Sequence, residues 1–139
     1  MERDFIYNFI RQHKYAVISS IANNLKPEAA LIGVAVSEDL EIIFDTVNTS
    51  RKYANILSNP KVALVIGWSD ARTLQYEGEA MELTEPSDDA YREIYYKAFP
   101  DGRERTETWP GLVHFKIKPT WIRYSDFTEH KTIKEMSFE

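Results

Sequence analysis

The most informative part of the chain is Phe44–Leu64, which reads FDTVNTSRKYANILSNPKVAL. An apolar run ends at Phe44-Asp45-Thr46, and Ser50-Arg51-Lys52 begins a segment with helical spacing. Asn59-Pro60 ends that segment, because proline disfavours helix in the residue before it, and an apolar strand follows. This order of strand, hydroxyls, two cations, short helix and strand predicts a cationic point at the start of a helix.

Two adjacent cations at a helix start suit a phosphate ligand. The first backbone N–H groups of a helix have no intrahelical partner, and the helix dipole adds about half a positive charge there. Ser50 would donate its hydroxyl, Arg51 would make a bidentate contact and Lys52 would add a compact charge. Two cations balance the roughly two negative charges of a phosphomonoester at neutral pH. The alternative is that both cations are ordinary solvated surface residues.

Composition limits the class of protein. The chain has 139 residues, 43% hydrophobic and 28% charged, so we expect one globular domain, 1–139, that ends in a polar C-terminal tail at 128–139. The net charge of −5 argues against a nucleic-acid partner. The absence of cysteine excludes disulfides, thiolate catalysis and Cys-ligated zinc. No apolar run has the length of a signal peptide core or a membrane span, so we expect a soluble, cytoplasmic protein without a membrane partner.

The remaining pattern predicts short antiparallel strands separated by small helices. Helices are expected at 3–13, 51–57 and 89–99, and strands at 15–21, 29–36, 40–45, 61–68, 72–83, 112–117 and 121–124. Gly78 is a candidate bulge, 103–110 is expected to be a charged loop, and the apolar run at 61–68 predicts burial on both faces. The pattern favours a compact α+β barrel that is mainly β.

The order of these features resembles the flavin-mononucleotide-binding (FMN-binding) split-barrel family related to pyridoxamine 5′-phosphate oxidase. The resemblance covers about residues 15–127. It rests on FDT at 44–46, SRK at 50–52, NPxVAL at 59–64, RTxQxEGxA at 72–80 and FxIxPxxIxY at 115–124. It implies a six-stranded antiparallel split β-barrel with small flanking helices, which works as a homodimer with FMN at the subunit interface.

The resemblance also implies eight cofactor-binding residues in three groups. One group would hold the flavin phosphate, one would run past the ribityl chain and ring, and one would reach the cofactor from the fifth strand. The phosphate group consists of Ser50, Arg51 and Lys52. The group along the ribityl chain and ring consists of Phe44, Asp45 and Thr46, and the group on the fifth strand consists of Thr73 and Gln75. The alternative for Thr73 and Gln75 is that they are strand residues that point to solvent. No catalytic residue is assigned, because flavin chemistry needs no dedicated base.

The chain departs from the vitamin-producing oxidase in two places. That enzyme binds its flavin with an arginine near the start of the second strand, whereas here no cation occurs between Lys26 and Val36. Its closing segment rich in Arg and Trp is replaced by Tyr124-Ser125-Asp126-Phe127 and a polar tail. A phosphorylated second substrate would lack its clamp, so we expect a relative similar to the general stress proteins and not the authentic oxidase.

Three functional hypotheses follow. The leading one is an FMN-dependent oxidoreductase whose small-molecule substrate is unknown. The second is a flavin-binding sensor or stress protein without turnover, and the third is a split barrel that uses deazaflavin or haem instead. The three histidines, His13, His114 and His130, lack metal-ligand spacing, so no metal site is expected. Only His114 lies within the expected strands, where a haem would need its axial ligand.

Overall fold

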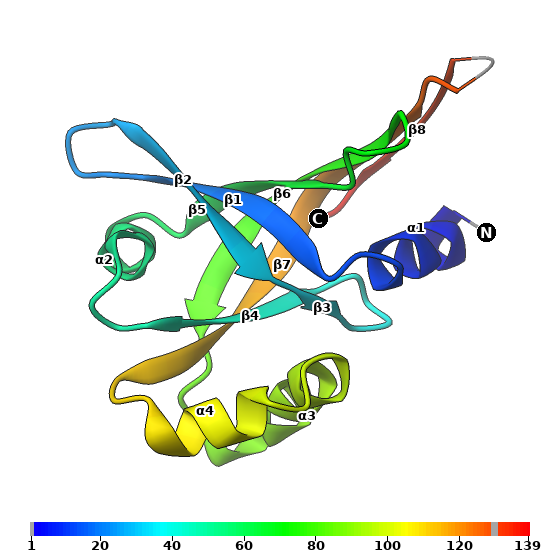
Figure 1. The fold of residues 1–139 in the computed structure, drawn as a ribbon. Helices are drawn as coiled ribbons and strands as arrows, with labels where there is room; N and C mark the ends of the chain where they lie inside the picture. Colours follow the sequence, from blue (N-terminus) through cyan, green and yellow to red (C-terminus); the bar gives the residue numbers. More distant parts are fainter. Residues whose placement is uncertain (1, 129–130) are drawn as a thin grey trace.

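The computed structural model describes residues 2–128 and 131–139, which form a strongly curled antiparallel sheet flanked by helices (Figure 1). The helices are α1 (Glu2–Arg11), α2 (Arg51–Ser58), α3 (Asp89–Ala98) and α4 (Gly102–Thr108), and a 3₁₀ turn, η1 (Pro86–Asp88), precedes α3. The strands are β1 (Tyr15–Ile21), β2 (Pro27–Gly33), β3 (Ala35–Val36), β4 (Ile42–Val47), β5 (Lys61–Ile66), β6 (Arg72–Glu82), β7 (Leu112–Asp126) and β8 (Thr132–Ser137).

The strands follow the order β2-β1-β5-β6-β7-β4-β3, and β8 pairs with β7. The long strand β7 connects the parts of this sheet. Its first half pairs with β4, with Ile117 opposite Ile42, and its second half pairs with β8, with Trp121 opposite Ser137. Because β6 runs beside both halves, the sheet curls around one core. The predicted antiparallel split barrel with small flanking helices is therefore confirmed.

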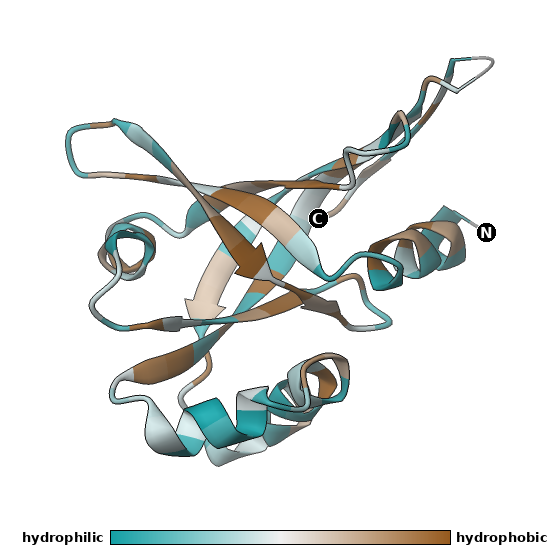
Figure 2. Cartoon of the chain, in the orientation of Figure 1, coloured by the Kyte–Doolittle hydropathy of each residue, from teal (hydrophilic) through white to brown (hydrophobic). Residues whose placement is uncertain are grey.

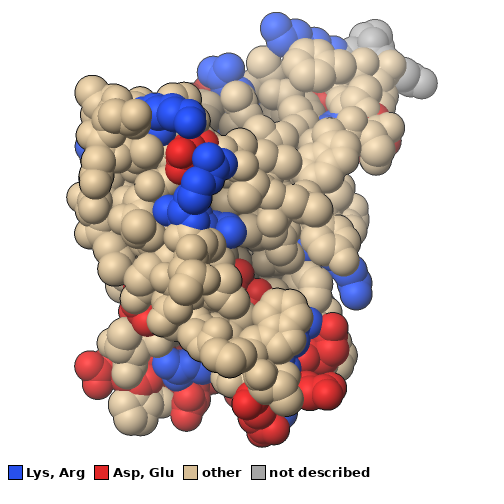
Figure 3. Space-filling view, turned by 60° about the vertical axis from the view of Figure 1, so that its left-hand side comes forward, with Lys and Arg blue, Asp and Glu red and all other residues tan. Residues whose placement is uncertain are grey.

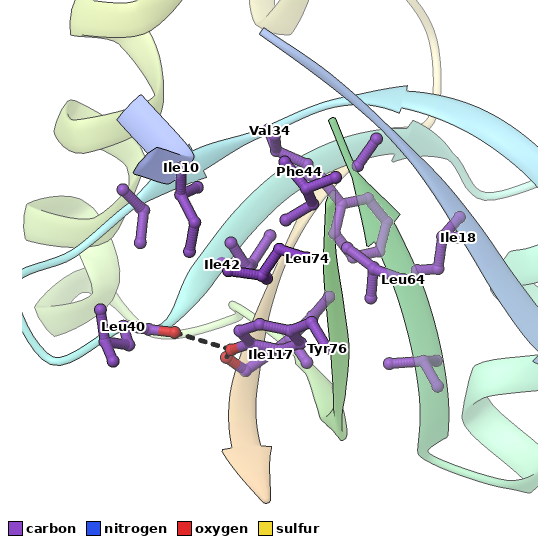
Figure 4. Packing of buried hydrophobic residues seen from close by; sticks show 14 of the residues in the cluster. Ile10, Ile18, Val34, Leu40, Ile42, Phe44, Leu64, Leu74, Tyr76 and Ile117 are labelled. Atoms are coloured by element: carbon purple, nitrogen blue, oxygen red, sulfur yellow. Dashed lines mark hydrogen bonds between the residues drawn. The ribbon is translucent and has the colours of Figure 1, made fainter. Parts of the chain in front are cut away.

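The core fills the concave side of the curled sheet. Apolar residues are concentrated on the strands, whereas α4 is mostly hydrophilic (Figure 2). Side chains from β4, β6 and β7 meet in the core, and Phe44, Tyr76, Phe115 and Ile117 are completely buried there (Figure 4). A second, smaller cluster lies between α3 and the convex side of β4, where Tyr95 and Phe99 pack with Ile43.

Gly78 marks a bulge in β6, as predicted. The register between β6 and β7 shifts between Glu77 and Gly78, opposite the segment that contains Pro119. A Cβ atom at position 78 would collide with the backbone carbonyl of Lys118, so only glycine allows the two strands to approach so closely.

Several strand predictions require correction. The sheet has eight strands among the described residues instead of six, because the expected strand at 29–36 bends after Gly33 into β2 and β3, and because β8 forms in the tail. The expected strands at 112–117 and 121–124 are one strand, β7, which continues through Pro119 at the bulge. The prediction that 61–68 is buried on both faces is wrong for this chain, since Lys61, Ala63 and Val65 are exposed on the convex face.

The expected loop at 103–110 is also wrong, because residues 102–108 form α4. Its charges are spaced as helical partners: Arg105 Nη1 lies 2.7 Å from Asp101 Oδ2, one turn earlier. The polar tail is ordered as β8 over 132–137, and Met136 and Phe138 pack against the core. Alternation of these apolar anchors with charged residues is the pattern of a half-buried strand.

Candidate functional site

The start of α2 has the predicted arrangement of hydroxyls. Ser50 has an extended backbone, and its Oγ accepts a hydrogen bond from the Tyr53 N–H at 3.3 Å, which makes it the N-cap of α2. The Thr46 hydroxyl, at the end of β4, lies 3.0 Å from the Ser50 Oγ. Strand β4 and helix α2 are thus joined by two hydroxyls directly before the two cations.

Arg51 and Lys52 border a small cavity between the start of α2 and the β1–β2 hairpin. Its volume is about 80 Å³, and it is lined by Ile18, Ser20, Glu28, Ala29, Ala30, Arg51 and Lys52. On this face of the molecule, cationic side chains gather around a smaller acidic patch (Figure 3). The cavity has the size and the cations for a compact anion such as a phosphate group, but it is too small for a flavin ring.

Glu28 is the acidic member of this site. Its Oε2 lies 3.2 Å from Arg51 Nη1 and 3.9 Å from Lys26 Nζ, and its Oε1 accepts a hydrogen bond from Asn55 Nδ2 at 2.9 Å. Asn55 Nδ2 also lies 3.0 Å from Ser20 Oγ. The Glu28 side chain is 12% exposed, whereas that of Arg51 is 67% exposed. A half-buried carboxylate therefore holds Arg51, the more exposed of the two cations predicted to bind phosphate.

The sequence prediction missed Glu28 because it considered only the absence of cations in β2. The spacing of residues in the β1–β2 hairpin could have indicated the position of Glu28. In an antiparallel hairpin whose loop is the three residues 23–25, Glu28 falls opposite Ser20, and the structure shows this loop and this pair. The hairpin alone does not predict that α2 packs beside this pair of residues.

Lys52 lies deeper in the structure than Arg51. Burial lowers the pKa of its ammonium from the ordinary value, and the nearby carboxylate of Asp45 acts in the opposite direction. Lys52 thus lines the cavity and is also influenced by the charge of Asp45 on β4. The structure brings Ser50, Arg51 and Lys52 together at the start of α2, and Thr46 joins them through its contact with Ser50.

Phe44 and Asp45 face opposite sides of β4. The Phe44 ring is fully buried and stacks on Phe115 at a centroid distance of 5.4 Å, so only its backbone could border a ligand. The Asp45 carboxylate turns toward the helices instead. Its Oδ1 accepts a hydrogen bond from the Tyr95 hydroxyl at 3.1 Å, and its Oδ2 lies 3.3 Å from Arg105 Nη2. Asp45 thus fastens α3 and α4 to the sheet.

Thr73 and Gln75 lie away from the cavity within this chain. Both are on β6, where Thr73 is opposite Ser125 and Gln75 is opposite Val65 and Arg123. Gln75 is exposed on the convex face, and Thr73 is half-buried. Neither residue lines the small cavity.

His114 is a buried polar residue to which the sequence assigned no role in flavin binding. It is opposite Asp45 in the β4–β7 register and is 3% exposed, with its ring at 5.5 Å from the rings of Tyr95 and Tyr96. Burial lowers the pKa of His114. The nearby Asp45 carboxylate acts to raise this pKa, and the cations Arg92 and Arg105 act to lower it further. Its Nε2 has no hydrogen-bond partner among the described residues.

The described residues provide neither a cluster suited to a metal ion nor a helix suited to cross a membrane. Within 2–128 and 131–139, no group of three or more His, Cys, Asp or Glu side chains is placed to hold a metal ion. His130 lies outside the described residues. In the same residues, none of the helices has both the length and the apolar character needed to cross a membrane.

The family model described as pyridoxamine 5′-phosphate oxidase matches residues 3–126. The chain belongs to this family. Over 89 residues it is 33% identical to the pyridoxine/pyridoxamine 5′-phosphate oxidase of Ehrlichia chaffeensis, a match that covers 63% of this chain and 43% of that protein. The chain thus spans less than half the length of this family member.

Two solved structures show the same fold. General Stress Protein 26 from Bacillus anthracis is 21% identical with a TM-score of 0.73, and the match covers 99% of this chain and 98% of that one. A heme binding protein from Mycobacterium smegmatis is 10% identical with a TM-score of 0.83, and the match covers 99% of this chain and 58% of that one. Both structural similarities agree with the split-barrel fold expected for this family.

Proposed function

We propose that the chain is an FMN-binding flavoprotein and acts as an oxidoreductase on a small molecule. The observation that carries this proposal is the group Ser50, Arg51 and Lys52 at the N-terminus of α2, beside a cavity of about 80 Å³. Helix N-terminal N–H groups and two cations suit the phosphate of a mononucleotide. Membership of the pyridoxamine 5′-phosphate oxidase family makes FMN the natural candidate among such ligands.

The flavin ring would lie outside this cavity, on a surface that two copies of the chain complete. On the convex face, Leu31, Val17 and Val65 are neighbours in one row across β2, β1 and β5, and all three are exposed. An exposed apolar row on a sheet is typical of an interaction surface. Gln75 continues the row on β6. In a homodimer built on this face, Thr73 and Gln75 would approach the flavin of the partner subunit.

The substrate differs from pyridoxamine 5′-phosphate in this proposal. A second phosphate needs its own cations, and the cations of the described site are already shared between one cavity and Glu28. When bound, FMN supplies transfer of a hydride or of electrons. The residues of the chain hold its phosphate, orient it and form the surface against which a substrate lies. We also propose that the protein acts in the cytoplasm.

The absorbance spectrum of the purified protein, followed by turnover, tests this function. We expect flavin bands that reduction by a nicotinamide cofactor bleaches and an added electron acceptor restores over repeated cycles. Flavin bands without repeated turnover would favour a flavin-binding sensor or stress protein. A protein that is colourless and takes up no added FMN would refute flavin binding.

Haem is a second candidate, because the fold is shared with a heme binding protein and because His114 has an unpartnered Nε2. His114 is buried beneath Tyr95 and Tyr96, so α3 would have to move before a haem iron could reach it. A Soret band that is lost in His114→Ala would establish this candidate, and flavin bands alone would exclude it. A deazaflavin would be distinguished by its own absorbance spectrum.

A further inference from the structure

The position of Glu28 affects what the cavity can bind. Both carboxylate oxygens are in use: Oε1 accepts a hydrogen bond from Asn55, and Oε2 pairs with Arg51 at 3.2 Å. Glu28 lines the same cavity as Arg51 and Lys52. A carboxylate therefore occupies the side of Arg51 that a phosphate in the cavity would contact.

A phosphate and the Glu28 carboxylate cannot share this site without cost. Both are anions, and their repulsion is strong where water is partly excluded, as it is beside a side chain that is 12% exposed. Arg51 contacts Glu28 through Nη1, so a bidentate contact with phosphate that uses Nη1 requires this nitrogen to leave Glu28. Arg51 can make this movement because most of its side chain is exposed.

We propose that Glu28 competes with the ligand phosphate for Arg51 and thereby sets how tightly the site holds a phosphomonoester. In the free chain Glu28 takes the place of the phosphate and keeps Arg51 beside the cavity. On binding, Arg51 exchanges the carboxylate for the phosphate. The naming of FMN as the ligand rests on the proposed function, whereas the competition itself concerns any phosphate at this cavity.

The variant Glu28→Gln isolates the charge. A glutamine has nearly the same shape, and its carbonyl oxygen can still accept the hydrogen bond from Asn55. Its amide carries no negative charge, so Arg51 is released. The matched control is Glu41→Gln, because Glu41 is a similarly buried carboxylate, 13% exposed, that pairs with Lys116 at 3.4 Å and does not line the cavity.

The experiment measures binding of inorganic phosphate, FMN and riboflavin to the wild type, Glu28→Gln and Glu41→Gln at one fixed ionic strength. We expect Glu28→Gln to bind phosphate and FMN about tenfold more tightly than the wild type, and riboflavin, which has no phosphate, within about twofold. Glu41→Gln should leave all three affinities unchanged.

The outcomes separate this inference from the proposed function. Tighter phosphate binding by Glu28→Gln without any flavin binding supports competition and refutes FMN as the ligand. Flavin binding in which Glu28→Gln leaves phosphate and FMN affinities unchanged or weaker overturns competition and keeps the proposed function. If neither the wild type nor Glu28→Gln binds any of the three ligands, both the competition and the proposed function are overturned.

Discussion

The hydroxyl of Tyr76 lies 2.7 Å from the backbone carbonyl oxygen of Leu40, deep in the core (Figure 4). Tyr76 is on β6, and Leu40 is in the turn before β4, where its backbone has a positive φ of 66°. The same hydroxyl is 3.1 Å from the carbonyl oxygen of Ile117 on β7. The single hydroxyl proton of Tyr76 is thus within hydrogen-bond distance of buried carbonyl groups on two other segments of the barrel, with the shorter distance to Leu40.

Replacing Tyr76 with Phe should destabilise the fold. The change leaves the Leu40 carbonyl buried without its donor, a loss of about 1–3 kcal/mol in the free energy of unfolding. Chemical denaturation measures this loss. The control is Tyr15→Phe, since Tyr15 is exposed and should change stability little. Equal stability of the two variants would show that the buried hydroxyl contributes nothing.

Stability should fall at alkaline pH because of the buried tyrosines. Burial raises the pKa of Tyr76 well above its ordinary value, and burial together with the Asp45 carboxylate raises that of Tyr95. Above about pH 10 the unfolded chain releases these protons while the folded chain keeps them, so the unfolded state gains stability as pH rises. Below that pH the contribution is fully present. Denaturation between about pH 8 and pH 11 should show a shallower decline in Tyr76→Phe than in the wild type. Parallel declines would contradict this assignment.

The double variant Arg51→Ala, Lys52→Ala should lose affinity for FMN. Each charged hydrogen bond contributes about 1.5–3 kcal/mol, reduced for Arg51 by its exposure, so a total loss of roughly 2–4 kcal/mol is expected. Riboflavin binding should change little, because it lacks the phosphate. Fluorescence titration measures both affinities, with Lys118→Ala as a control for an exposed cation away from the cavity. Unchanged FMN affinity in the double variant would remove phosphate recognition from the start of α2.

The convex face gives a prediction about assembly. Val65 is 40% exposed in the row with Val17, and an aspartate there would place a charge in the proposed dimer interface. We expect Val65→Asp to shift the protein from dimer to monomer in light scattering coupled to size-exclusion chromatography. Leu57→Asp, on the exposed side of α2, should leave the dimer intact. A dimer that survives Val65→Asp would place the interface elsewhere, and a wild-type monomer would refute the proposed dimer.

Much of the fold was predictable because its signals are local. The strand at 61–66, the helix from Arg51 and the bulge at Gly78 each depend on a few adjacent residues, and each occurs close to where the pattern places it. The segment 102–108 was missed because its charges read as a solvated loop, whereas Asp101 and Arg105 pair along one helical turn. Strand β8 was missed because its few apolar anchors stand among polar residues and were taken for a polar tail, whereas the segment pairs with β7.

The site was predictable in part for the same reason. Ser50, Arg51 and Lys52 are adjacent in sequence, so their meeting at the start of α2, where Arg51 and Lys52 line the cavity, follows from local structure. Glu28 is separated from Arg51 by 23 positions, and their contact depends on how α2 packs against the β1–β2 hairpin. The roles proposed for Thr73 and Gln75 depend on a further step, the proposed association of two chains, which the fold of one chain does not determine.

The most direct test of the central claim is a comparison of FMN and riboflavin binding to the wild-type protein, freed of any bound flavin and titrated by fluorescence at constant ionic strength. Because the two ligands differ only in the phosphate, their affinity ratio measures what the start of α2 contributes. We expect FMN to bind at least about 30-fold more tightly than riboflavin. Equal affinities, or no binding of FMN, would contradict the central claim.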